Sequence, residues 1–548
     1  MRRLFLLFFT ASALGMLAQD VPEPLRVGVS LAQRKLTLRE AVEMAVSHNL
    51  EIEIERTDVA TAYQAIKAAQ GVYDPVFQWQ PALDSQTLPT GSVLQGPTGS
   101  VSDRILSQDF TFRQRVPWTG SLLSVDFNNN RQSTTNPFVT LNPFITSRLF
   151  LQLTQPLLRN SFVDRERSEI RIRSTQAQVS EADLAVAVID VITRAEQAYW
   201  DLAAALEDVQ VKRENVELAR EQVARSERMI QAGILADVEL SAAEAELQRR
   251  LDTYYASVAS LTNAENALKL LLAPGRQADI WNDQIIPVDR GALEAPEIYD
   301  LRANIKLAMS ERPELRATRL LQQANEIQTR LSRNQTRPQL DLVASYASTG
   351  LAGDISDRGN PFVSNLLLLE RVNQLSTSAG LAPLPAQSFG AVPPLLVGGY
   401  EAALSNLFSG RYQSFRVGVS FDLNLRNRTA EAELAQSTIA ERRLKLQQSQ
   451  LEQAIEAQVR NALQALQSSH QRMAAAEASV KAAKIKLESE IRLFQNGEST
   501  NFLVLTRQNE YADSRLRLVV AQADHSKALT RLRQAAGRTL REHHVVVK

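Results

Sequence analysis

Few residues of this chain have types and spacing suited to chemistry. The 548 residues include no cysteine, which excludes disulfides, thiolate nucleophiles and cysteine-ligated metals. The five histidines are scattered apart from the pair His543 and His544, and none has the spacing of metal ligands. Asp237 and Glu239 form one carboxylate pair, which we interpret as the solvated first turn of a helix, where the helix dipole favours acidic residues. We therefore predict no catalytic residue, no metal site, no cofactor and no enzymatic activity.

The charge balance and the N-terminus indicate where the chain works. Basic and acidic residues number 61 each, so no excess points to nucleic acid or to an acidic tail. Arg2 and Arg3 precede an apolar stretch that ends in small residues at Ala18, which predicts a signal peptide over 1–18, with a signal anchor as the alternative. No later stretch of about 18 apolar residues follows, so entry into a membrane would require β-strands.

The sequence contains an internal duplication, and two glycines mark equivalent positions in its two halves. Gly233 interrupts one long segment free of Gly and Pro, and Gly497 interrupts another, at an offset of 264 residues (497 − 233). The same offset relates two apolar series with heptad spacing, which predicts coiled-coil packing. The longer arms of about 70 residues would form helices about 100 Å long. The series are Leu202, Val209, Val216, Val223 and Ile230, and Leu466, Met473, Val480, Leu487 and Phe494.

Segments with strict alternation of apolar and polar residues precede the long helices. One runs from Phe415 to Leu425, another from Leu340 to Tyr346, and a third surrounds Leu149, Leu151 and Leu153. A fourth opens near Val76, and Pro75 and Pro338 mark the two strand entries. Alternation of this kind is typical of a transmembrane barrel wall, with a half-buried strand of a soluble sandwich as the alternative for each segment.

Four strands cannot close a barrel, because the smallest closed barrels use about eight. Open edges in lipid would leave backbone groups unpaired. On this interpretation, identical copies must therefore share one barrel.

Six motifs in this order carry a family resemblance: LTLREAVEMAVSHN, GVYDPVF, QLTQPLLRN, AEQAYWDLAAA, RMIQAGILADVEL and RLFQNGESTNFLVL. Together they resemble the TolC family of outer-membrane efflux and secretion ducts. The resemblance implies an α+β membrane protein. Its trimeric 12-stranded β-barrel, with four main strands per protomer, joins a long periplasmic α-helical coiled-coil barrel built by internal duplication.

The resemblance also implies a domain layout. After the signal peptide, residues 38–275 form the first structural repeat of helix, barrel strands and long helical hairpin. Residues 276–300 form an equatorial linker, 301–537 the second repeat and 538–548 a C-terminal tail. Parts of 275–303 and the C-terminal stretch would girdle the tunnel.

The implied function is a passive exit duct for efflux or type I secretion in a double-membraned bacterium. A homotrimer in outer-membrane lipid would open when a periplasmic adaptor and an inner-membrane pump of the RND, ABC or MFS class engage it. The chain would bind no nucleic acid, and without a cysteine it would carry no lipid anchor. The alternatives are a periplasmic coiled-coil adaptor of an export complex, which would have one hairpin, and a secreted enzyme with a helical stalk.

The resemblance places the periplasmic gate at the glycine turns, Gly233 and Gly497. Family members often carry acidic residues six and nine positions after the second glycine, where this chain has Leu503 and Thr506. A closed-state constraint of aromatic, arginine and acid falls on Phe494, Ser499 and Glu239, so the arginine is missing. Leu503 suggests a hydrophobic gate, with packing between helices as the equal alternative.

The sequence leaves the cargo, the pump and two segments unassigned. The sequence does not identify the cargo, which could be a drug, metal, metabolite or protein, or the class of pump. It does not assign a role to the hairpin at 107–131 or to the long loop at 347–412, in which Leu366–Leu369 suggests a short helix.

Overall fold

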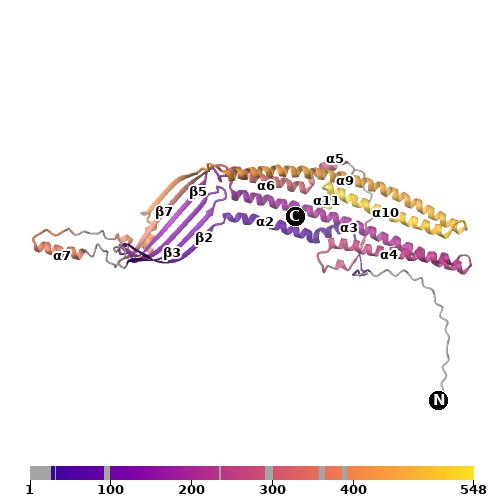
Figure 1. Ribbon diagram of the computed structural model, residues 1–548, viewed down its shortest axis with the longest axis horizontal. Coiled ribbons are helices and arrows are strands. Elements are labelled where there is room, and N and C mark those ends of the chain that lie inside the picture. The colour runs from indigo at the N-terminus through magenta and orange to yellow at the C-terminus, as the bar shows by residue number, and fades with distance from the viewer. Residues whose placement is uncertain are drawn as a thin grey trace, which may run out of the picture. The chain divides into compact units, whose positions relative to one another are not determined.

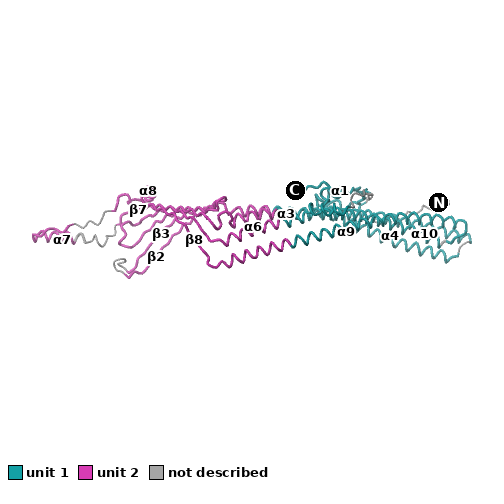
Figure 2. The backbone as a smooth tube through the Cα atoms, turned by 90° about the horizontal axis from the view of Figure 1, so that it is seen from above, with its two compact units in different colours: residues 1–60, 178–319, 446–548 teal, residues 61–177, 320–445 magenta. Residues whose placement is uncertain are grey.

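The structure is a computed structural model that describes residues 26, 28–30, 32–91, 99–233, 236–289, 300–356, 365–385 and 392–547. The signal peptide predicted at 1–18 lies outside these residues, as do 290–299 of the expected linker and parts of the loop at 347–412. The described chain divides into two compact units (Figure 2), here called unit 1 (residues 1–60, 178–319 and 446–548) and unit 2 (residues 61–177 and 320–445). Each unit combines segments from both sequence repeats.

Unit 2 is built on one six-stranded antiparallel sheet (Figure 1), in the order β2-β3-β4-β5-β7-β8. The four strands predicted from alternation are confirmed as β2, β5, β7 and β8, and β2 and β7 begin directly after Pro75 and Pro338. The bounds are β2 (Val76–Pro89), β3 (Ser100–Arg115), β4 (Leu122–Thr134), β5 (Leu141–Pro156), β7 (Gln339–Ile355) and β8 (Gln413–Asp422).

The sheet has two strands in addition to the four main strands expected, because β3 and β4 lie between β2 and β5. These two strands are the hairpin predicted at 107–131, whose place the sequence did not settle. Their alternation is less strict than that of the other strands. Gln108 shares a face with Phe110, and Asn129 shares one with Phe127, so the apolar face is interrupted within each strand.

A short helix packs against the sheet of unit 2. Helix α8 (Tyr400–Phe408) approaches β7 at Gly350, where a Cβ atom would lie 2.0 Å from the Ala403 carbonyl oxygen. Only glycine permits this approach, and Ser348 Oγ fixes it by donating to the Leu407 carbonyl at 2.6 Å. Helix α7 (Asn365–Ser378) confirms the short helix expected at 366–369.

The predicted long helices are confirmed. α3 (Arg165–Gln231) and α9 (Arg428–Gln495) have 67 and 68 residues, and each is followed by a shorter helix, α4 (Asp237–Leu272) or α10 (Asn501–Ala535). The two repeats also begin alike, with α1 (Leu38–His48) and α2 (Leu50–Gln70) in the first and α5 (Leu301–Glu311) and α6 (Pro313–Gln335) in the second. Among the described residues, no helix has the length and apolar character needed to cross a bilayer.

The two heptad series face the interior, as predicted. Leu202, Val216, Leu466 and Met473 are buried, and the other members are half-buried. The series are therefore most buried in the middle of the long helices and less buried towards the glycine turns. This burial accounts for helix formation over such a length, since isolated helices depend on packing of an apolar face for most of their stability.

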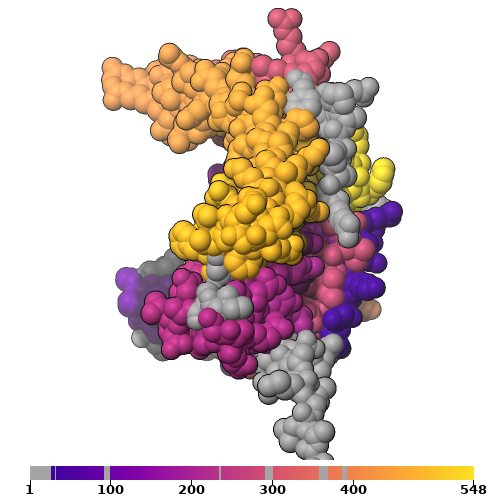
Figure 3. Space-filling model, turned by 90° about the vertical axis from the view of Figure 1, so that its right-hand side faces the viewer, coloured from indigo at the N-terminus to yellow at the C-terminus, as the bar shows by residue number. Residues whose placement is uncertain are grey.

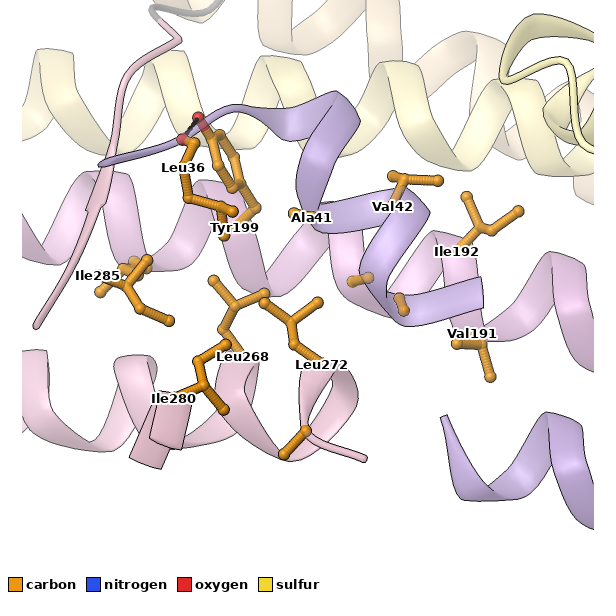
Figure 4. Packing of buried hydrophobic residues seen from close by; sticks show 14 of the residues in the cluster. Leu36, Ala41, Val42, Val191, Ile192, Tyr199, Leu268, Leu272, Ile280 and Ile285 are labelled. Atoms are coloured by element: carbon orange, nitrogen blue, oxygen red, sulfur yellow. Dashed lines mark hydrogen bonds between the residues drawn. The ribbon is translucent and has the colours of Figure 1, made fainter. Parts of the chain in front are cut away.

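A small sheet that the sequence did not predict lies in unit 1. Strand β1 (Gln33–Leu36) pairs in parallel with β6 (Gln284–Pro287), and both cover an apolar cluster on α3 and α4 (Figure 4). Tyr199 of the AEQAYWDLAAA motif is fully buried there. Its hydroxyl donates to the Asp289 carboxylate at 2.8 Å and accepts the Val288 N–H at 3.1 Å. Burial raises the pKa of this hydroxyl, so the Tyr199 side chain stays uncharged. Its hydrogen bonds link α3 to the segment that follows β6.

A buried ion pair lies beneath the same sheet. Glu265 and Lys269, one turn apart on α4, are almost inaccessible, and their charged atoms are 3.1 Å apart. Glu265 also accepts the Ile285 N–H at 2.9 Å and pairs with Arg26, while Lys269 donates to the Trp281 carbonyl at 3.0 Å. The described part of the expected equatorial linker is thus held to α4 by charge as well as by apolar contact. The C-terminal stretch is held to α3 through His543 and Glu196.

Candidate functional site: the glycine turns and the helices beside them

The two glycine turns lie in unit 1, where the α3–α4 end (magenta) and the α9–α10 end (yellow) lie side by side (Figure 3). Gly233 and Gly497 have φ values of 71° and 79°, in the left-handed region that favours glycine. No atom lies within 4 Å of a Cβ built on either glycine, so backbone conformation alone explains their identity. After α9, the Glu498 N–H bonds back to the Leu493 carbonyl at 2.9 Å, which is the six-to-one bond of a Schellman motif.

The gate residues predicted after Gly497 lie at the start of α10. Thr500 caps the helix by accepting the Leu503 N–H. Leu503 is 37% exposed in the single chain, and Thr506 is half-buried with its hydroxyl bonded to the Phe502 carbonyl at 2.8 Å. The Thr506 hydroxyl is already hydrogen-bonded within its own helix. Leu503 is therefore the more available of the two for contact with another chain.

Ser499 belongs to a polar cluster that the sequence did not predict. Its hydroxyl donates to the Glu490 carboxylate on α9. Arg507 on α10 lies 3.6 Å from the same carboxylate and 2.7 Å from Glu510. An arginine and an acid therefore do meet beside the second turn, although neither occupies the position that the resemblance indicated. We call Glu490, Ser499 and Arg507 the tip latch, because they join α9 to α10 across the turn.

The remaining predicted gate residues are not joined to the tip latch. Phe494 is half-buried at the end of its heptad series on α9. Glu239 is exposed in the first turn of α4, and within the described residues its side chain has no hydrogen bond or ion pair. Glu239 thus occupies the solvated, dipole-favoured position proposed for it from the sequence.

A second polar cluster joins three helices farther from the turns. Arg250 of α4 is 4% exposed. Its guanidinium donates to the Asn215 carbonyl on α3 at 2.9 Å and to Asn509 Oδ1 on α10 at 3.0 Å, and it pairs with Glu246 at 2.9 Å. The planar fork of arginine suits such a junction, because it presents several donors in fixed directions.

Glu246 is the anionic centre of this cluster. Burial alone would raise its pKa, but hydrogen bonds from Arg249, Arg250 and Asn509 lower the pKa of Glu246 to about 2. The carboxylate therefore stays ionised through the neutral and mildly acidic range.

The sequence did contain a signal for Arg250, which was missed. Ala243, Arg250 and Ser257 are spaced by seven and all are buried, so Arg250 interrupts a helix seam of otherwise small, uncharged residues. A charge at a seam position predicts a partner on a facing helix. Two further ion pairs join α3 to α10, Glu214 with Arg515 and Asp201 with Lys527.

Within the described residues, no group of three or more His, Cys, Asp or Glu side chains is arranged to hold a metal ion. The polar clusters described above consist of opposite charges and neutral polar groups that pair with one another. Such pairs can set helix geometry and can be broken and remade when helices move.

Solved structures with the same fold include an outer-membrane channel and other membrane proteins. The chain superposes on the Campylobacter jejuni CmeC outer membrane channel with a TM-score of 0.60 and 15% identity, covering 92% of this chain and 86% of that one. The outer membrane protein VceC of Vibrio cholerae superposes with a TM-score of 0.59 and 14% identity, covering 91% of this chain and 96% of that one. A membrane protein from Pseudomonas aeruginosa superposes with a TM-score of 0.61 and 16% identity, covering 91% of this chain and 93% of that one. No curated protein sequence matches the chain.

Structural matches at this low identity establish the fold alone, whereas a match to a family model establishes the family. The model described as outer membrane efflux protein matches residues 122–273 and 304–538, which together make up well over half of the chain. The two matched segments fall within the two sequence repeats, and each ends just after a shorter helix, α4 or α10. The chain belongs to the outer membrane efflux protein family, and it is an outer-membrane efflux duct.

Proposed function

We propose that three copies of this chain assemble in the outer membrane as one passive duct, with unit 2 supplying the membrane wall and the helices of unit 1 a periplasmic tunnel. An adaptor and an energised inner-membrane pump would open the tunnel at the glycine turns. The chain itself would catalyse no reaction.

One observation carries the proposal: the sheet of unit 2 has two open edges. Within the described residues β2 pairs only with β3, and β8 only with β7. All fourteen residues of β2 and nine of the ten residues of β8 are exposed in the single chain. Unpaired backbone groups of this kind are costly in lipid. Pairing β2 of one copy with β8 of the next would satisfy them, and a closed ring would remove every edge.

The apolar character of these edges supports the same assembly. Phe77 and Trp79 of β2 are 67% and 57% exposed, and Phe415 of β8 is 75% exposed. Side chains of this size on a water-exposed surface mark a contact with lipid or protein. A periplasmic adaptor works in water, where a broad sheet with exposed apolar edges would be unfavourable. This observation therefore favours the duct over the adaptor.

For the gate, we propose that Leu503 forms a ring around the threefold axis and closes the duct by excluding water. Its position in the first turn of α10 and its free apolar surface support this role. A ring of leucines can stop ion flow by dewetting without any acidic constriction.

The test is conductance across a planar lipid bilayer. Leu503→Asp would hydrate the constriction and raise the conductance of the closed duct at least about tenfold. Phe502→Asp, at the neighbouring and more exposed position, is the matched control and should leave it unchanged. An unchanged closed state in Leu503→Asp would show that Leu503 only packs between helices. A protein that never conducts, even with its adaptor present, would count against the duct itself.

A further inference from the structure

We propose that the β3–β4 hairpin is part of the membrane wall, so that each copy contributes six strands and the trimer closes with eighteen. This inference rests on the proposed function. It makes the barrel wider than the twelve strands expected from the sequence.

The pairing order of the sheet is the first argument. β2 is joined to β5 only through β3 and β4, and the register is continuous from β2 to β3, from β3 to β4 and from β4 to β5. A four-stranded wall would need β2 to pair directly with β5, and the structure has no such pairing within its described residues. If the hairpin left the wall, β2 would lose its only neighbour.

The strand lengths give a second argument. A tilted strand needs about 9–11 residues to cross the hydrocarbon core. β3 has 16 residues and β4 has 13, against 14 in β2 and 16 in β5. Each strand of the hairpin is therefore long enough to cross the bilayer.

The register supplies the decisive observation, because one cross-strand row runs through all six strands with only aliphatic or aromatic side chains, the one polar atom among them being the Tyr346 hydroxyl. We call it the apolar rung. Its members pair in sequence from β2 to β8: Phe77, Phe112, Val125, Leu151, Tyr346 and Phe415.

The next row, one residue away, points to the opposite face of the sheet and is polar at five of its six positions. We call it the polar rung: Val76, Arg113, Ser124, Gln152, Ser345 and Arg416. In these two rows, an apolar face and a polar face continue across the hairpin, as a wall between lipid and water requires. In a hairpin lying outside the wall, the apolar and polar positions would not need to match those of the neighbouring strands.

Side-chain contacts on the hairpin fit this assignment. On the apolar face, the ring of Phe110 lies 6.3 Å from that of Trp79 on β2 and 6.2 Å from that of Phe127 on β4. On the polar face, Thr111 donates to Asp126 at 2.9 Å. Aromatic side chains thus cluster on one side of the hairpin, and hydrogen-bonded polar groups lie on the other.

The consequence is a wide lumen. Six strands from each of three copies make eighteen, and barrel diameter grows roughly in proportion to strand number, so the barrel would be about 1.5 times as wide as a twelve-stranded one. Barrels of 16–18 strands enclose an open aqueous channel. The outer-membrane part would therefore admit bulkier cargo than a twelve-stranded wall would.

The absence of cysteine makes a direct test possible. Four single-cysteine variants would be placed in lipid vesicles and treated with a charged, membrane-impermeant thiol reagent. Val125→Cys and Ser124→Cys probe the two faces of β4. Leu151→Cys and Gln152→Cys are their direct cross-strand partners on β5, a strand already expected in the wall, and serve as matched controls.

The expected result is alternation on both strands. The cysteines at 124 and 152 should react readily. Those at 125 and 151 should react at least about tenfold more slowly, because lipid suppresses thiolate formation. A fluorophore attached at 125 or 151 in detergent should be quenched by brominated lipid after reconstitution.

Three outcomes separate the possibilities. Alternation on β5 without alternation on β4 would overturn the six-stranded wall and leave the duct standing. A β4 pair that is wholly unreactive and unquenched would also overturn it, because the hairpin would then pack within protein. Loss of alternation on both strands would refute the membrane role of the sheet, and with it the proposed function.

Discussion

Introducing one charge on the apolar face of β4 tests the location of the sheet energetically. Val125 lies at the centre of the apolar stretch of its strand, between Leu123 and Phe127 on the same face, and its row is apolar on every strand. Val125→Arg would place a guanidinium in hydrocarbon. Substitution by Arg or Lys near the midplane of a barrel wall costs about 2–4 kcal/mol.

Each trimer carries the substitution three times, so the total cost would be about 6–12 kcal/mol per assembly if the three sites are independent. This is comparable with the whole folding free energy of a small domain. The matched control is Ser124→Arg, one residue away on the polar face, where a charge can remain hydrated. There the expected cost is below about 1 kcal/mol per copy.

The assay is a urea titration of protein inserted in lipid vesicles, with the inserted fraction measured by protection from protease. We expect Val125→Arg to lower the urea midpoint strongly and Ser124→Arg to leave it near that of the unsubstituted protein. Equal effects at the two positions would refute the assignment of faces. A larger effect at Ser124 would mean that the polar face meets the lipid.

Three further predictions concern unit 1. Lys269→Met should destabilise the unit by about 3–5 kcal/mol, because it breaks a buried ion pair and leaves the buried Glu265 with one cation, Arg26, in place of two; thermal unfolding measures this, and a midpoint equal to that of the parent protein would contradict it. Glu246 has a folded pKa of about 2, below its ordinary 4.5, so its stabilising contribution is present above pH 4.5 and lost as pH falls towards 2. Glu246→Gln should remove that part of the acid dependence, and an identical pH profile for the variant would argue against it. Glu490→Gln removes the carboxylate that holds Arg507 across the second turn, so amide exchange there should rise about fivefold, for a loss of about 1 kcal/mol. Unchanged exchange would mean that the tip latch contributes nothing.

The sequence predicted those parts of the fold that depend on local periodicity. Heptad spacing located α3 and α9, and the glycines located the turns, because both follow from single-helix geometry. Strict alternation located β5, β7 and β8. The repeat offset then linked the two halves, and the family model confirms that the chain is an outer membrane efflux protein.

The features that the sequence did not predict depend on contacts between distant segments. β1 and β6 have only four residues each, too few for a pattern, and they form because Tyr199 and Asp289 hold them on α3. The β3–β4 hairpin became part of the sheet only through its register with β2 and β5. Because the alternation of apolar and polar residues in β3 and β4 is interrupted, the sequence pattern of either strand alone does not indicate that the hairpin belongs to the sheet.

The gate was the least predictable part, for a physical reason. A salt bridge across a turn can be built from several pairs of positions, so Glu490 and Arg507 can join α9 to α10 without matching the positions that the resemblance indicated. The role of Leu503 depends on other copies of the chain and stays a prediction.

The mass of the purified particle in detergent tests the central claim most directly. The chain has a mass of 60.9 kDa, so three copies correspond to about 180 kDa of protein, slightly less after removal of a signal peptide. We predict a single trimeric species that needs detergent to stay in solution. A stable particle of about 60 kDa that remains monomeric in plain buffer would contradict the account, because both edges of its sheet would then tolerate water unpaired.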